Sequence, residues 1–154
     1  MIFKTLSVPN VRISVVERIK TVRPDSRALW GKMTASQMLC HLSDSFGCAF
    51  GDIPLALVGS LLHQTVLMSV ALWVPVPWPK NYQTRPEMDQ LIGGTPPGEF
   101  AADRKHLVQR VEKFGRPGFD FTPSLHPIFG KMSPAEWRRW GYLHVDHHLR
   151  QFGA

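Results

Sequence analysis

The sequence is poor in cysteine, and this excludes one large class of small proteins. Its 154 residues include only two cysteines, Cys40 and Cys48, and these do not form a Cys-x-x-Cys pair. Two cysteines are too few for the disulfide framework of a small secreted domain. The composition therefore favours a reducing compartment.

The chain also lacks a hydrophobic run long enough to span a membrane. Its longest apolar stretch, residues 65–78, has 14 residues and ends in alternating prolines, whereas a spanning helix needs about 20 apolar residues. Charges at Lys4, Arg12 and Glu17 interrupt the first residues, unlike the apolar core of an export signal. We therefore expect no transmembrane span, a buried or interfacial helix in the apolar stretch, and a cytoplasmic location.

Acidic residues are scarce relative to basic ones. The chain has 18 Lys and Arg against 12 Asp and Glu, a formal net charge of +6, and only 19% charged residues in all. The hydrophobic fraction of 44% is enough to build one core. We expect a single folded domain over residues 1–154 and exclude a disordered chain.

Alternating strand patterns are absent, and five helical segments are predicted instead. Residues 11–22 carry apolar side chains near the 3.6-residue helical period. A hydroxyl followed three residues later by Gln or Glu, the capping box, begins helices at Thr34 and Ser133. The remaining segments are about 54–73, with Pro54 in its first turn, and 99–114.

A long proline-rich piece, residues 74–98, separates two of these segments. It contains six prolines and a Gly-Gly pair, so it cannot form a regular helix. A connection of about 25 residues is unusual in a compact domain and often has a function, such as that of a lid or crossover.

Histidine is the informative residue type. Of seven histidines, His144, His147 and His148 lie within five consecutive positions near the C-terminal end of the last helix. His144 and His148 differ by about 40° around the helix and by about 6 Å along it, so they share a face. Two imidazoles in this arrangement can bind one metal ion. His147 lies at the edge of that face and is interpreted as a flanking residue.

His41 is the best candidate for a third ligand. It lies about 10 Å along its helix from the cap at Thr34, whereas His148 and His144 lie about 6 and 12 Å from the opposite helix end. An antiparallel pair of helices would bring the three histidines to one height. Two alternatives remain: histidines four residues apart occur on solvated helices, and His41 lies among apolar residues as a core histidine would.

Three sequence blocks carry a family resemblance. They are WGKMTASQMLCHL (residues 30–42), HPIFGKMS (126–133) and GYLHVDHHLRQF (141–152). Together they resemble the DUF1569 branch of the DinB/YfiT-like superfamily. The resemblance implies an all-α four-helix bundle of up-down-down-up topology, here with an additional apolar helical segment and a Pro-rich loop between helices two and three. It also implies that His41, His144 and His148 bind a divalent metal.

The metal expected from this resemblance is zinc or nickel, with an open coordination position. Related branches include thiol-dependent transferases, so the chain is interpreted as a metal-dependent thiol transferase or hydrolase acting on a small-molecule substrate, with a low-molecular-weight thiol as one candidate. Asp44 is a candidate base or orienting group for His41, or else a surface or capping carboxylate. Gln151 is a candidate hydrogen-bond partner for a water at the metal, or else a cap for carbonyls near the chain end.

Two non-enzymatic interpretations stay open. One is a basic aromatic patch for nucleic acid, and it is disfavoured because the chain has no recognised nucleic-acid motif. The other is a homodimeric structural protein that uses the apolar residues 65–79 as its contact. The patch would consist of Arg138, Arg139, Arg150, Trp137 and Trp140.

Overall fold

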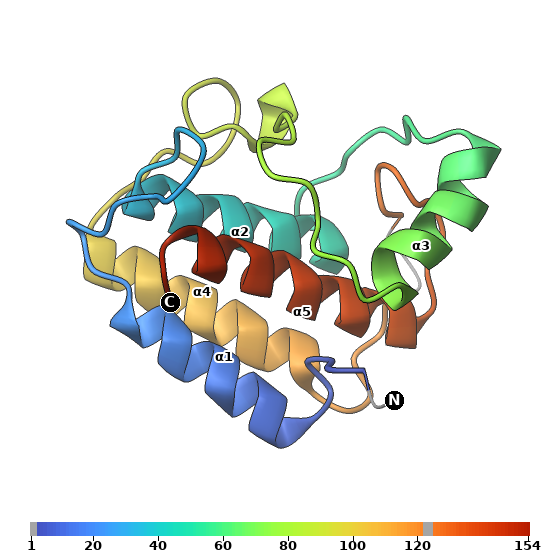
Figure 1. Cartoon of the computed structure of the whole chain (residues 1–154), viewed down its shortest axis with the longest axis horizontal. Coiled ribbons are helices and arrows are strands. Elements are labelled where there is room, and N and C mark those ends of the chain that lie inside the picture. Colours follow the sequence, from blue (N-terminus) through green and yellow to red (C-terminus); the bar gives the residue numbers. More distant parts are fainter. Residues whose placement is uncertain (1–2, 122–124) are drawn as a thin grey trace.

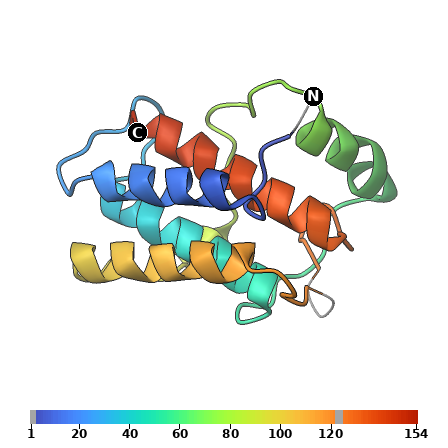
Figure 2. The same cartoon turned by 90° about the horizontal axis from the view of Figure 1, so that it is seen from below.

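The computed structural model describes residues 3–121 and 125–154, and within these residues helices and no strands form. Figures 1 and 2 show that α1 and α5 run in one direction and that α2 and α4 run in the other. The expected all-α bundle is confirmed, and the described helices follow the up-down-down-up order. The long helices are α1 (Pro9–Thr21), α2 (Ala35–Phe50), α4 (Phe100–Gly115) and α5 (Pro134–Gln151).

Capping boxes begin the two helices that carry the candidate histidines. The Thr34 hydroxyl accepts from the Gln37 backbone N–H, while the Gln37 side chain accepts from the Thr34 N–H. Ser133 and Glu136 make the same reciprocal pair at α5. The end of α2 is Gly51, in the left-handed conformation with φ 80°, which glycine adopts without steric cost. The expected starts of both helices are therefore confirmed.

Helix α2 is the most deeply buried element, because α4 and α5 both pack against it. Trp137, Phe46 and Phe114 are the largest fully buried side chains and join the helices in one core. α5 approaches this core closely at Gly141, where an added Cβ would lie 2.6 Å from the Phe114 ring. This close approach brings α4 and α5 together, and Phe46 on α2 also contacts Trp140 on α5.

The helix predicted at about residues 54–73 forms only in part, within the apolar segment, residues 53–79. No helix begins at Pro54. The chain is irregular to Ser60 and becomes helical from position 61, through the π-helix η1 (His63–Leu67) into α3 (Met68–Trp73). The backbone N–H groups of Val58 and Gly59 donate to the Pro127 carbonyl instead, at 2.8 and 3.2 Å. A helix starting at Pro54 would need these two N–H groups for its own hydrogen bonds, and here they bond to a distant loop instead.

The Pro-rich segment, residues 74–98, is irregular as expected, apart from one 3₁₀ turn, η2 (Pro86–Met88). The segment passes beside α2 and contacts this helix through η2. Across the part of the chain that the structure describes, no helix has the length and hydropathy to cross a membrane.

Candidate metal centre

His41 on α2 and His144 and His148 on α5 form a compact group. Their ring centroids are separated by 5.2 Å (41–144), 4.9 Å (41–148) and 5.1 Å (144–148). One ring nitrogen from each lies within 4.8 Å of the other two. α2 and α5 run antiparallel (Figure 1), which is the arrangement that the height argument required. The three histidines predicted from spacing and resemblance are brought together.

Hydrogen bonds fix which nitrogen of His41 carries the proton. Its Nδ1 lies 3.0 Å from the Met88 carbonyl oxygen. A carbonyl only accepts, so Nδ1–H donates and the lone pair of Nε2 is left free. That Nε2 lies 3.3 Å from Nε2 of His144. Two nitrogens bound at about 2.0–2.1 Å to one tetrahedral zinc ion are separated by about 3.3–3.4 Å, so this pair has a spacing that one ion fits.

Gln151 fixes His148 in the same way. Its Nε2 donates to the Trp30 carbonyl at 2.8 Å, which sets the orientation of the amide. Its Oε1 then accepts from Nδ1 of His148 at 2.8 Å. The ring therefore presents an unprotonated Nε2 to the group. Carbonyl partners of this kind orient metal-binding histidines in many proteins.

Burial keeps all three rings neutral. It lowers the pKa of His41, and it lowers the pKa of His148 to about 3, with the nearby His41 as a further cause. The pKa of His144 lies well below its usual range, because of burial and then of the charges that His148 and His41 would carry. The neutral imidazole is the form that binds metals.

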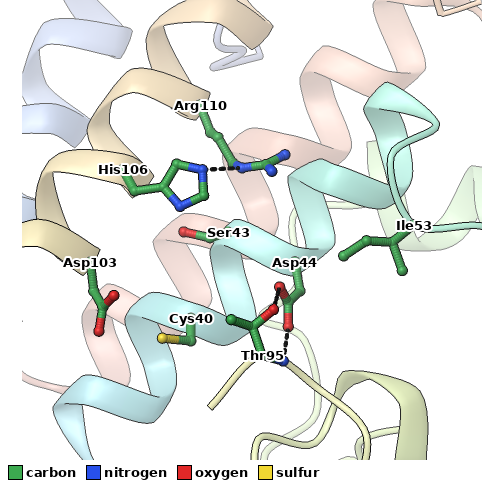
Figure 3. Close-up of a pocket in the computed structure, with 8 residues that line it drawn as sticks. All are labelled: Cys40, Ser43, Asp44, Ile53, Thr95, Asp103, His106 and Arg110. Atoms are coloured by element: carbon green, nitrogen blue, oxygen red, sulfur yellow. Dashed lines mark hydrogen bonds between the residues drawn. The ribbon is translucent and has the colours of Figure 1, made fainter. Parts of the chain in front are cut away.

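Asp44 does not hydrogen-bond to His41. Its Oδ2 accepts from Gln90 Nε2 (3.0 Å) and from the Thr95 backbone N–H (2.8 Å), and its Oδ1 accepts from the Thr95 hydroxyl (2.7 Å). Figure 3 shows the two bonds to Thr95. Asp44 thereby fastens the Pro-rich segment to α2, and that segment supplies the Met88 carbonyl. Its assignment as a catalytic base remains a prediction.

The cysteines are unlike reactive thiols. Burial raises the pKa of Cys40 and of Cys48 to about 12, with the charge of Asp103 or Asp44 as a further cause. Both thiols are therefore protonated at neutral pH, whereas the thiolate is the nucleophile and the ligand. Cys40 also belongs to a pocket of about 110 Å³ between α2 and α4, whose lining includes none of the three histidines (Figure 3).

Two tryptophan rings contact His144, one from α5 itself and one from the Pro-rich segment. Trp140 lies 5.1 Å from it and Trp78 lies 6.1 Å from it, between ring centroids. Trp78 is held by a hydrogen bond from its Nε1 to the Ala71 carbonyl. His147 is half-buried beside Trp30 and His148, at 5.7 and 5.2 Å. Trp140 precedes His144 by about one helical turn, so that contact follows from local spacing. Trp78 and Trp30 come from segments far away in the sequence, and their contacts leave no local pattern.

Most of the basic aromatic patch is buried: of its residues Arg150 is exposed and Arg138 is partly exposed. Trp137 and Trp140 are buried in the core, and so is Arg139, which donates to the Leu72 and Lys4 carbonyls. Arg150 forms an ion pair with Asp146. Bases cannot stack on buried indoles, so this alternative loses its structural basis.

The fold and the site define a helical bundle with a buried three-histidine group that could hold a metal ion. The chain belongs to the family described as a protein of unknown function (DUF1569), whose model matches residues 6–154. Comparisons with curated proteins and with solved structures found no match.

Proposed function

We propose that His41, His144 and His148 bind one divalent metal ion, zinc or nickel, and that the protein is a metal-dependent enzyme. The observation that carries the proposal is the convergence of three neutral imidazoles, two of which are held by acceptors on Nδ1. These hydrogen bonds leave Nε2 of His41 and of His148 unprotonated and oriented to bind a metal ion. The likeness of residues 30–42 and 141–152 to the DinB/YfiT-like superfamily supports the same ligand set.

The chemistry proposed is thiol transfer or hydrolysis. A metal with three histidine ligands and an open position acts as a Lewis acid and lowers the pKa of water or a thiol bound there. The chain's own residues position the ligands: Met88 holds His41, and Gln151 holds His148. The rings of Trp78 and Trp140 pack beside His144, which is partly buried. A small molecule, with a low-molecular-weight thiol as one candidate, is the proposed substrate.

Metal content is the direct test. We expect elemental analysis of protein purified without chelators to find about one zinc or nickel ion per chain. His41→Ala and His148→Ala should each lose most of it. His106→Ala is the matched control, because His106 is exposed and outside the group, and it should keep the metal. Wild-type protein without metal would overturn the proposal.

Activity separates the two reactions from a binding role. Thiol consumption with electrophilic substrates and hydrolysis of ester or amide substrates should be assayed on metal-loaded protein and on the histidine variants. Thiol consumption that disappears with His148→Ala supports the transferase, and thiol-independent hydrolysis that disappears supports the hydrolase. A metal-loaded protein inactive in both would contradict the enzymatic proposal and leave only metal binding.

A further inference from the structure

The apolar segment, residues 53–79, exposes large hydrophobic side chains although its inner side chains are already packed against the core. It contains no Asp, Glu, Lys or Arg. Soluble monomers rarely leave a broad contiguous patch of this kind uncovered. Its side chains with 41–79% of their area exposed are Leu57, Val58, Leu61, Leu62, Val66, Leu67, Val70, Val74 and Val76.

The exposed side chains form the outer surface of a layer whose inner surface is already packed. Leu72 is fully buried, and Met68 and Ala71 pack against the core. Leu62, Val66 and Val70 recur at four-residue spacing on the outside. Figures 1 and 2 show α3 at one end of the molecule, at the margin of the bundle. The outer surface is therefore available without unfolding.

Basic residues border this surface. Lys131 is exposed and follows Gly130, which faces the Gln64 side chain so closely that an added Cβ would lie 2.7 Å from it. Lys4 is exposed at the other end. Its carbonyl accepts from Arg139, whose guanidinium lies over the Trp73 ring.

We propose that the outer surface of the apolar segment binds an anionic lipid bilayer, lying in the headgroup region without crossing it. Exposed aliphatic side chains bordered by lysines are suited to that interface, where apolar groups enter the acyl boundary and cations meet lipid phosphates. The net charge of +6 adds attraction at longer range. A second copy of the chain is a less suitable partner, because both molecules carry a net charge of +6 and the apolar segment has no acidic residue to pair with the lysines.

Vesicle sedimentation tests this proposal in the full chain. We expect binding to phosphatidylcholine vesicles that contain phosphatidylglycerol, weaker binding to pure phosphatidylcholine, and weakening by salt. Leu62→Glu/Val66→Glu should reduce binding at least tenfold. Lys131→Glu should reduce binding to the anionic vesicles about fivefold or more. The matched control is Leu91→Glu/Ile92→Glu, which changes exposed residues outside the segment and should reduce binding far less.

Circular dichroism should show that the variants keep the wild-type helical signal, since the altered side chains are exposed. Val76→Glu, in irregular chain, is a second variant that should also weaken binding. Absence of vesicle binding, or equal binding by Leu62→Glu/Val66→Glu, would overturn the proposal. Light scattering that shows a dimer dissociated by this variant, without vesicle binding, would assign the surface to a second copy and equally overturn it. None of these readouts depends on metal.

Discussion

Helix α2 and the helix of the apolar segment both carry leucines, yet the environments of these leucines are opposite. Leu42 on α2 has 0% of its area exposed, whereas Leu62 has 64% exposed. α2 is packed by α4 and α5 together, while the apolar segment has the bundle on one side only. The comparison teaches that hydrophobicity alone does not decide burial. A side chain is buried where a second and a third element cover it.

The strongest test of this contrast is a matched pair of truncations. Leu42→Ala should lower the free energy of unfolding by about 2–5 kcal/mol, because it leaves a cavity in the core. Leu62→Ala should change it by less than about 0.5 kcal/mol, because water already contacts that side chain. Urea denaturation followed by circular dichroism measures both. Equal losses of unfolding free energy in the two variants would mean that the side chain of Leu62 is buried in solution.

The histidine region should also be the acid-sensitive one. The pKa of His148 is lowered to about 3 in the folded protein, against about 6.5 in an unfolded chain. Between these values the unfolded state binds more protons, so stability is lost as pH falls. From pH 7 to about 4 this ring alone should cost about 3 kcal/mol.

Urea denaturation of chelator-treated protein at several pH values measures this dependence. His148→Gln should flatten the profile. His63→Gln should not, because His63 is exposed in the apolar segment. An unchanged pH profile in His148→Gln would contradict the assignment of the acid sensitivity to His148.

Asp44 is expected to matter through the Pro-rich segment. Asp44→Asn removes the charge and turns an N–H₂ group toward the donors of Gln90 or Thr95, at a cost of about 1–3 kcal/mol. If the Pro-rich segment loosens, the Met88 carbonyl no longer orients His41, and metal binding should weaken as well. The control is Asp52→Asn, since Asp52 is a half-exposed partner of Arg110 and should cost less than about 0.5 kcal/mol. Thermal unfolding and metal titration measure the two effects, and full loss of activity with unchanged metal affinity would instead support a catalytic base.

At Gln151 the expected effect is confined to metal binding. Gln151→Leu removes the acceptor for Nδ1 of His148 and should weaken metal binding about tenfold to hundredfold. Gln151→Glu keeps the acceptor for Nδ1 but loses the donor to the Trp30 carbonyl, so its affinity should lie between those of wild type and Gln151→Leu. Competition with a chromophoric chelator measures both. Equal affinities for wild type and Gln151→Leu would show that the hydrogen bond at 2.8 Å does not position the ligand.

Several parts of the fold were predictable because their causes are local. Thr34 and Ser133 begin helices through side-chain bonds to residues three positions on, and the heights of His41, His144 and His148 along their own helices follow from helical rise. The start of the apolar helix was predicted wrongly at Pro54. The helix begins later because the backbone N–H groups of Val58 and Gly59 donate to the carbonyl of Pro127, in a loop far away in the sequence.

Local sequence was enough to predict the four long helices, the caps at Thr34 and Ser133 and the shared face of His144 and His148, because each depends on residues within a few helical turns. Tertiary structure alone decided that Met88 and not Asp44 bonds to His41. It also decided that Gln151 bridges His148 to Trp30 and that the apolar segment stays exposed. Backbone carbonyls and neighbouring surfaces have no residue signature. Their effects exist only once segments far apart in the chain have packed together.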